Sequence, residues 1–115
     1  MRPIDIYLAA PYKYDDPDVE HERFEAVSTK AAELMNEGKL VFSPLSHAHP
    51  LKEFADLPGG WDYWAKLDTA FLSVCKELHI LCLQGWTSSQ GVQEETKIAD
   101  AMGIPVVYHD PECDQ

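Results

Sequence analysis

The chain has few cysteines and no long apolar run, and both absences exclude classes of protein. Its three cysteines, Cys75, Cys82 and Cys113, are odd in number and lack the C-x-x-C spacing of zinc and redox sites, so we expect reduced thiols in a cytosolic setting. No stretch approaches the ~20 consecutive apolar residues of a membrane helix. The first residues lack the basic and apolar regions of a signal peptide. These absences predict a soluble cytoplasmic protein with no membrane partner.

Positively charged residues are also scarce. Lys and Arg together number 9 against 20 Asp and Glu, which gives a formal net charge of −11 at pH 7. Binding to a nucleic-acid polymer requires clustered Lys and Arg that displace the counterions of the phosphate backbone. The composition therefore predicts no nucleic-acid polymer as partner and leaves a small molecule open.

A glycine-rich dinucleotide fingerprint is missing as well. The first apolar run ends in Ala9-Ala10-Pro11, and no G-x-G-x-x-G follows it. This disfavours a dinucleotide-dependent oxidoreductase. A flavodoxin-like electron carrier stays open, and it would be yellow as purified.

The remaining composition is typical of one folded domain. The chain has 115 residues, of which 45% are hydrophobic and 25% are charged. Apolar runs predict strands at residues 4–10, 39–44, 78–83 and 104–108. Helical periodicity predicts helices from 17 to 37, from 61 to about 76 and from about 90 to 102.

The predicted ends of these helices have recognisable signals. Asp16 is expected as the N-cap of the first helix, with Pro17 at its first position and Gly38 just beyond its end. Gly103 is expected to stop the last helix. Residues 45–60 contain prolines and two glycines. We interpret them as a long loop, which in a compact domain is typical of a binding loop, a lid or disorder.

Alternating strands and helices predict an α/β fold of the Rossmann or flavodoxin-like type. Right-handed crossovers then give a single three-layer domain with a four-stranded parallel sheet, in the order 2-1-3-4. Pro105 places the last strand at an edge. Ligands bind such sheets at the carboxyl ends of the strands, where the order reverses. We therefore expect the site to be built from residues 9–12, 43–49 and 84–89.

Two acidic residues fall on the apolar side of their predicted helices. Asp68 lies within a stripe formed by Trp64, Phe71, Leu72 and Cys75. Glu95 lies three residues after Val92 and four before Ala99. Buried carboxyl groups in a cleft are candidates for acid–base or nucleophilic catalysis. The structural alternatives are that Glu95 complements its helix N-terminus and that Asp68 faces solvent through a small error in register.

The entry to the last helix carries two hydroxyls and a glycine, in Ser88-Ser89-Gln90-Gly91. A helix N-terminus with such side chains suits a phosphate or a sugar hydroxyl. Ser89 alone is equally explained as an N-cap.

Histidines and aromatics follow the second predicted strand. His47 and His49 form an H-x-H pair, but no third metal ligand is evident and Pro50 follows at once, so we expect no metal and a role in contacting base or phosphate. The alternative is two exposed loop histidines. Trp61, Tyr63 and Trp64 offer faces for stacking on a nucleobase, although a tryptophan at such a position is more often core.

The segment from Ser89 to Glu95 resembles the S/D-x-G-x-x-x-E signature of the nucleoside 2-deoxyribosyltransferase-like superfamily. The strand containing Tyr7 resembles the superfamily's opening strand, and Asp68 resembles its helix aspartate. The resemblance covers nearly the whole chain, and the chain looks most like the superfamily's small members of unknown function. The resemblance implies that Glu95 is a nucleophile toward the anomeric carbon, that Asp68 handles the proton of the departing base, and that Tyr7 orients Glu95. An N-glycosidic bond breaks through an oxocarbenium-like transition state, so two carboxyl groups suffice. We expect no cofactor and no metal.

The resemblance also implies a substrate class and a homo-oligomer. The superfamily's transferases carry aspartate where this chain has Ser89, and its hydrolases of deoxynucleoside 5′-monophosphates carry serine, which favours a nucleotide here. In the loop Pro11-Tyr12-Lys13 only Lys13 is positively charged. Whether the substrate is a nucleoside or a monophosphate, and whether the second step is hydrolysis or transfer, therefore remain open. The predicted substrate-binding residues are Ala10, Tyr12, Lys13, His47, His49, Trp86, Ser88, Ser89 and Gly91. The alternative is a non-catalytic nucleotide-binding or sensing module that uses the same crevice.

Overall fold

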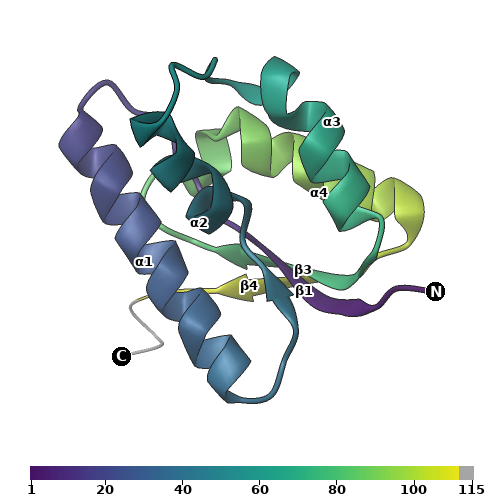
Figure 1. Ribbon diagram of the computed structural model, residues 1–115. Coiled ribbons are helices and arrows are strands. Elements are labelled where there is room, and N and C mark those ends of the chain that lie inside the picture. Colours follow the sequence, from purple (N-terminus) through teal and green to yellow (C-terminus); the bar gives the residue numbers. More distant parts are fainter. Residues whose placement is uncertain (112–115) are drawn as a thin grey trace.

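The structure is a computed structural model that describes residues 1–111 (Figure 1). Cys113 lies outside these residues. The strands are β1 (Ile4–Ala9), β2 (Val41–Phe42), β3 (Cys75–Leu81) and β4 (Val106–His109). The α-helices are α1 (Pro17–Asn36), α2 (Pro44–Ala48), α3 (Trp61–Leu72) and α4 (Gln90–Met102), and two short 3-10 helices are η1 (His49–Glu53) and η2 (Trp86–Ser88).

The four strands form one parallel sheet in the order β2-β1-β3-β4, as predicted. Helix α1 covers one face of the sheet, and α3 and α4 cover the other (Figure 1). The result is a three-layer Rossmann-like α/β fold. β4 lies at the edge of the sheet, directly after Pro105, where a missing N–H is tolerated.

Alternation along β1 divides the interior into two apolar clusters. Ile6 and Leu8 pack with Val27 of α1 on one face, whereas Tyr7 and Ala9 face α3 and α4 on the other. Leu8 and Val27 are completely buried. Burying a side chain of this size contributes about 1.5–3 kcal/mol to folding. β1 is therefore held from both sides, which fixes the position of Tyr7.

The helix ends follow their sequence signals. The side chain of Asp16 accepts a hydrogen bond from the amide of Asp18 at 2.9 Å, and Pro17 opens α1. Gly38 and Gly103 adopt positive φ values of 92° and 71° just beyond α1 and α4, a conformation that a residue with a Cβ adopts only at a cost.

Two predictions of secondary structure are wrong. Part of the long loop expected at 45–60 is helical, because Pro44 and Pro50 stand in the first turns of α2 and η1, where a missing N–H costs nothing. The second predicted helix was also extended too far. α3 ends at Leu72 and β3 begins at Cys75, whose early residues Lys76 and Glu77 are polar and hide the start of the strand. None of the helices within residues 1–111 is long and apolar enough to cross a membrane.

Candidate functional site

A cavity of about 540 Å³ opens at the carboxyl ends of β1 and β3, at the predicted reversal of strand order. Its walls come from the segment after β1, the first half of α1, the pair α2 and η1, residues 57–60, α3, and the start of α4. A cavity of this size is in the range of small-molecule sites.

Glu95 forms part of the cavity wall and is 5% exposed. Its position on the inward face of α4 agrees with the predicted periodicity. The hydroxyl of Tyr7, from the completely buried middle of β1, donates a hydrogen bond to Oε2 of Glu95. The N-cap of α4 is Ser89, whose hydroxyl accepts from the amide of Val92 at 3.3 Å. Capping α4 therefore does not require Glu95.

Asp68, on α3, lines the same cavity and is half-buried. Burial raises its pKa to about 6. Burial raises the pKa of Glu95 to about 8; the hydrogen bond from Tyr7 opposes this shift and the charge of Asp68 adds to it. Burial, together with the two acidic neighbours, also holds the pKa of Tyr7 well above its usual value, so the phenol stays a donor. The site thus contains two carboxyl groups that titrate near neutral pH.

The start of α4 forms another part of the wall. Ser88, Ser89 and Gly91 all line the cavity, as predicted. The hydroxyl of Ser88 donates to the carbonyl of Gly85 at 3.2 Å, and Ser89 acts as the N-cap. The capping interpretation of Ser89 is thus correct, and Ser89 also lines the cavity.

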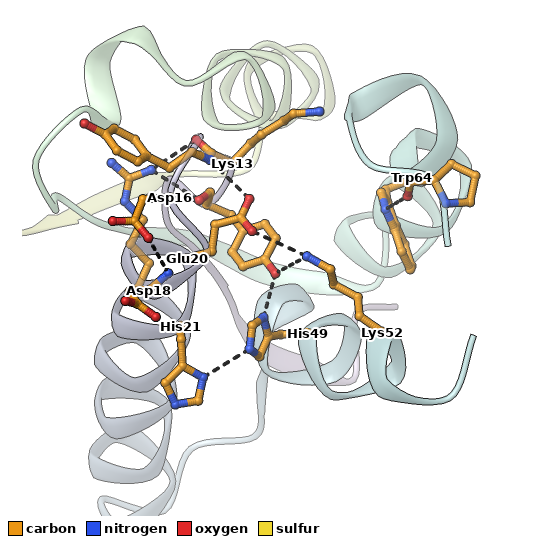
Figure 2. Close-up of polar contacts among 12 residues, drawn as sticks. Lys13, Asp16, Asp18, Glu20, His21, His49, Lys52 and Trp64 are labelled. Atoms are coloured by element: carbon orange, nitrogen blue, oxygen red, sulfur yellow. Dashed lines mark hydrogen bonds and ion pairs between the residues drawn. The ribbon is translucent and has the colours of Figure 1, made fainter. Parts of the chain in front are cut away.

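A polar cluster stands at the opposite wall. The hydroxyl of Tyr12 lies 2.6 Å from Nδ1 of His49 and accepts a hydrogen bond from Nζ of Lys52 at 3.0 Å. Nζ of Lys52 also lies 3.5 Å from a carboxylate oxygen of Glu20. Figure 2 shows Glu20, His49 and Lys52 pointing toward one another from α1 and η1. The phenol comes from the segment after β1, the carboxylate of Glu20 from α1, and the imidazole and ammonium groups both from η1.

Arg23 joins two loops beside the cavity. Its guanidinium donates to the backbone carbonyls of Tyr12 and Lys13 at 3.3 Å each, and to that of Gln84 at 2.9 Å. These contacts tie the segment after β1 to the segment after β3. Arg23 also lines the cavity.

The structure brings most of the predicted site residues together. The predicted residues that line the cavity are Ala10, Tyr12, Lys13, His49, Asp68, Ser88, Ser89, Gly91 and Glu95, and Tyr7 lies directly behind Glu95. Trp61 and Trp64 line it as well, and the indole N–H of Trp64 is fixed by the carbonyl of Pro58 at 3.0 Å. Tyr63 does not line the cavity and is exposed.

Two predicted binding residues are not part of the cavity. His47 is exposed on α2, with its ring centroid 6.1 Å from that of Phe42. Helical residues two apart point in different directions, so His47 turns away where His49 turns in. Trp86 packs beside Tyr108, with ring centroids 5.6 Å apart, because η2 directs it toward β4. The expected ligand contacts of His47 and Trp86 are therefore corrected.

The helical conformation also separates the two imidazoles of the H-x-H pair. His49 contacts Tyr12 and His21, and His47 lies against Phe42. Among residues 1–111, no group of three or more His, Cys, Asp or Glu side chains is arranged to hold a metal ion.

Sequence reasoning missed Lys52 and Arg23. Lys52 was assigned to a loop, although the Ser-Pro pair at Ser43 and Pro44 is the same helix-start signal as Asp16-Pro17. Arg23 lies on the first half of α1, which begins next to the carboxyl end of β1. Its place in the sequence, soon after the first strand, was the signal that could have predicted Arg23 near the site.

A family model described as a domain of unknown function, DUF1937, matches residues 4–110. The chain belongs to the DUF1937 family. The matched DUF1937 domain extends from β1 through β4 and includes every residue that lines the cavity. No curated protein matches the chain.

Proposed function

We propose that this DUF1937 protein cleaves or transfers the N-glycosidic bond of a deoxynucleoside or a nucleoside 5′-monophosphate, with Glu95 as the nucleophile. The observation that carries the proposal is the buried Tyr7–Glu95 hydrogen bond at a cavity that Asp68 also lines. Pairs of carboxyl groups with perturbed pKa values in one cavity are typical of acid–base and glycosidic chemistry. The resemblance to the nucleoside 2-deoxyribosyltransferase-like superfamily supports the same roles for these three residues.

In the first step, a carboxylate oxygen of Glu95 forms a bond to the anomeric carbon while the bond from that carbon to the base nitrogen breaks. The base takes the bonding electron pair and accepts a proton from Asp68. In the second step, water or another base attacks the anomeric carbon while the bond from that carbon to the Glu95 oxygen breaks, which restores the carboxylate of Glu95, and Asp68 accepts the proton of the attacking group. Attack by water gives hydrolysis, and attack by a base gives transfer.

This chemistry requires Glu95 ionised and Asp68 protonated at the same time. Between pH of about 6 and 8 the two carboxyl groups together hold one proton. The hydrogen bond from Tyr7 favours the form with the charge on Glu95, because it stabilises a carboxylate more than a carboxylic acid. Burial outweighs this effect, because the pKa of Glu95 stays above that of Asp68. Tyr7 therefore raises the population of the reactive form, with the charge on Glu95 and the proton on Asp68, without making it the major form.

Release of free base tests the proposal. Deoxynucleosides and deoxynucleoside 5′-monophosphates are incubated with the protein, with and without a second free base, and the products are separated by chromatography. We expect base release or exchange with the wild type and none with Glu95→Gln. Turnover that survives in Glu95→Gln would overturn the role of Glu95, and no turnover of any compound would remove the enzymatic proposal.

A non-catalytic nucleotide-binding module is the second candidate, favoured by the size and mixed polarity of the cavity walls. Such a module has no use for an ionised Glu95. Its ligand affinity would be almost unchanged in Glu95→Gln, and no base would be released by the wild type.

We also propose that the protein is a homo-oligomer that works in the cytoplasm on small molecules. Phe54, at the end of η1, is 83% exposed, and Tyr63 on α3 is 48% exposed. Both flank segments that line the cavity. Light scattering that gives the 13.0 kDa mass of a single chain would contradict the oligomer.

A further inference from the structure

Basic residues gather at this cavity in an otherwise acidic protein. Lys13, Arg23 and Lys52 line it, although the whole chain has only 9 Lys and Arg residues and a net charge of −11. The guanidinium of Arg23 is used by three backbone carbonyls. Lys52 differs from Arg23 because its partners are side chains that hold its ammonium group at the cavity wall.

Two side chains, Tyr12 and Glu20, fix the position of that ammonium group. The phenol of Tyr12 accepts from Nζ at 3.0 Å, and Glu20 of α1 lies 3.5 Å away. The other carboxylate oxygen of Glu20 accepts from the amide of Tyr14 at 3.1 Å, which holds Glu20 in turn. Lys52 also lies over the ring of Tyr12, with Nζ 5.1 Å from the ring centroid. A flexible lysine side chain is thus ordered before any ligand arrives, which reduces the entropic cost of binding.

The hydrogen bonds of the cluster run in one direction. Burial, followed by the charges of Lys52 and His21, lowers the pKa of His49, so its ring is neutral at pH 7. In the tautomer with its proton on Nε2, the neutral ring accepts from Tyr12 at Nδ1 and donates to Nδ1 of His21, 3.3 Å away. The hydroxyl hydrogen of Tyr12 is then directed to His49, and the lone pairs of its oxygen are left for Lys52. Figure 2 shows this chain from Lys52 to His21.

We propose that Lys52 is a substrate-binding residue of the DUF1937 cavity whose ammonium group donates a hydrogen bond to an oxygen acceptor of the ligand. An ammonium group has three N–H donors, and Tyr12 and Glu20 account for two. Lys52 lines the cavity and its side chain is 44% exposed, which leaves the third for a ligand. The oxygen belongs to a 5′-phosphate or to a carbonyl group of the nucleobase, and the choice of a nucleoside or nucleotide rests on the proposed function.

Direct binding to an inactive protein tests this inference separately from turnover. Glu95→Gln serves as the background, so that every ligand stays intact, and affinities are measured by calorimetry. The ligands are deoxyadenosine, deoxyinosine, deoxycytidine and deoxyuridine, each with and without a 5′-phosphate, and inorganic phosphate. Lys52→Met keeps the aliphatic stem and removes the charge. The matched control is Lys97→Met, on the exposed face of α4 away from the cavity.

We expect Lys52→Met to weaken binding roughly 10- to 100-fold for ligands that carry the recognised oxygen, the range for a hydrogen bond to a charged group. Tyr12→Phe, which removes the hydroxyl that holds both Lys52 and His49 but keeps the ammonium group, is expected to produce a smaller loss for the same ligands. Loss of the preference for phosphorylated ligands identifies the phosphate, and loss of a preference between keto and amino bases identifies the carbonyl. Lys97→Met is expected to change nothing.

Equal affinities in Lys52→Met and Lys97→Met, or a loss of the same size for every ligand, would overturn the inference. If inorganic phosphate binds in a manner that depends on Lys52 while no nucleoside or nucleotide binds, the oxygen-binding role stands and the proposed function fails. If none of these compounds binds, both are wrong.

Discussion

The hydroxyl of Tyr7 donates a hydrogen bond to Oε2 of Glu95, which links the middle of β1 to the second turn of α4. Tyr7 is completely buried and Glu95 is 5% exposed. Burying a carboxyl group is unfavourable unless it is hydrogen-bonded or protonated. The fold thus keeps a costly group at the wall of its cavity, which is typical of a residue retained for chemistry rather than for stability.

Replacing Tyr7 by Phe is expected to lower kcat/KM roughly 10- to 100-fold, the range for one hydrogen bond to a charged group. The phenyl ring keeps the contact with Phe42, whose ring centroid lies 5.8 Å away. Since the hydrogen bond from Tyr7 lowers the pKa of Glu95, the higher of the two, its loss also moves the alkaline limb of the pH–rate profile to higher pH. The control is Tyr108→Phe, at an exposed position. An unchanged alkaline limb in Tyr7→Phe would contradict the orienting role.

The pH–rate profile of the wild type is expected to be bell-shaped, with limbs near pH 6 and 8. Below the lower limb both carboxyl groups are protonated and no nucleophile is present. Above the upper limb both are ionised and the departing base receives no proton. In Asp68→Asn only Glu95 titrates, and without the charge of Asp68 its pKa falls, so the residual rate rises with pH to a plateau. If the pH–rate profile of Asp68→Asn is still bell-shaped, the two limbs belong to other titrating groups.

Stability is expected to fall as the pH is raised through the neutral range. Glu95 has a folded pKa of about 8 against an ordinary value of 4.5. Below pH 4.5 it is protonated in both states and has no effect; above that value the unfolded chain ionises first, and the folded state loses stability until pH 8. Glu95→Gln removes this loss, so its melting temperature at pH 8 exceeds that of the wild type by several degrees.

The control for that measurement is Glu94→Gln, at the adjacent position, where the carboxylate pairs with Lys97 and is partly exposed. Its melting temperature is expected to follow that of the wild type at every pH. A wild-type melting temperature that is flat between pH 5 and 8 would show that Glu95 is not protonated in the folded protein.

Replacing Ser89 by Asp tests whether the ligand places a phosphate or a hydroxyl group at the start of α4. Aspartate caps a helix as well as serine does, so the melting temperature stays close to that of the wild type. Its negative charge repels a phosphate, and the preference for monophosphates over nucleosides is expected to fall at least tenfold. Ser89→Ala, which removes the cap, is expected to lose about 1 kcal/mol of stability. An unchanged preference in Ser89→Asp would place the phosphate elsewhere.

The order of strands and the inward-facing carboxyl groups of Asp68 and Glu95 were predictable because both depend on short-range periodicity. The apolar runs and the helix-end signals at Asp16 and Gly103 are local, and right-handed crossovers leave few ways to order four parallel strands. Asp68 and Glu95 were predicted to face inward because each occupies an apolar position of a helix. That prediction needs no knowledge of the neighbouring elements.

The rest of the site could not be predicted because it depends on contacts between distant segments. Lys52 meets Tyr12 only because α2 and η1 fold back over the carboxyl ends of the strands. Of the prolines that open these helices, the sequence predicts Pro44 in the second strand and Pro50 in a loop. The sequence predicts His47 and His49 in a loop, and in an extended conformation both would share a face. In a helix they separate, so His49 reaches the cavity and His47 does not.

Trapping the glycosyl-enzyme tests the central claim most directly, since Asp68, with the lower pKa, is the rival nucleophile. The protein is incubated with nucleosides and monophosphates that carry fluorine at the 2-position of the sugar, which slows breakdown of a covalent intermediate. Intact-mass and peptide mass spectrometry then locate the added glycosyl group. We expect one group per chain on the peptide containing Glu95, and none in Glu95→Gln. A glycosyl group on Asp68, or base release by the wild type that proceeds equally well in Glu95→Gln, would contradict the account.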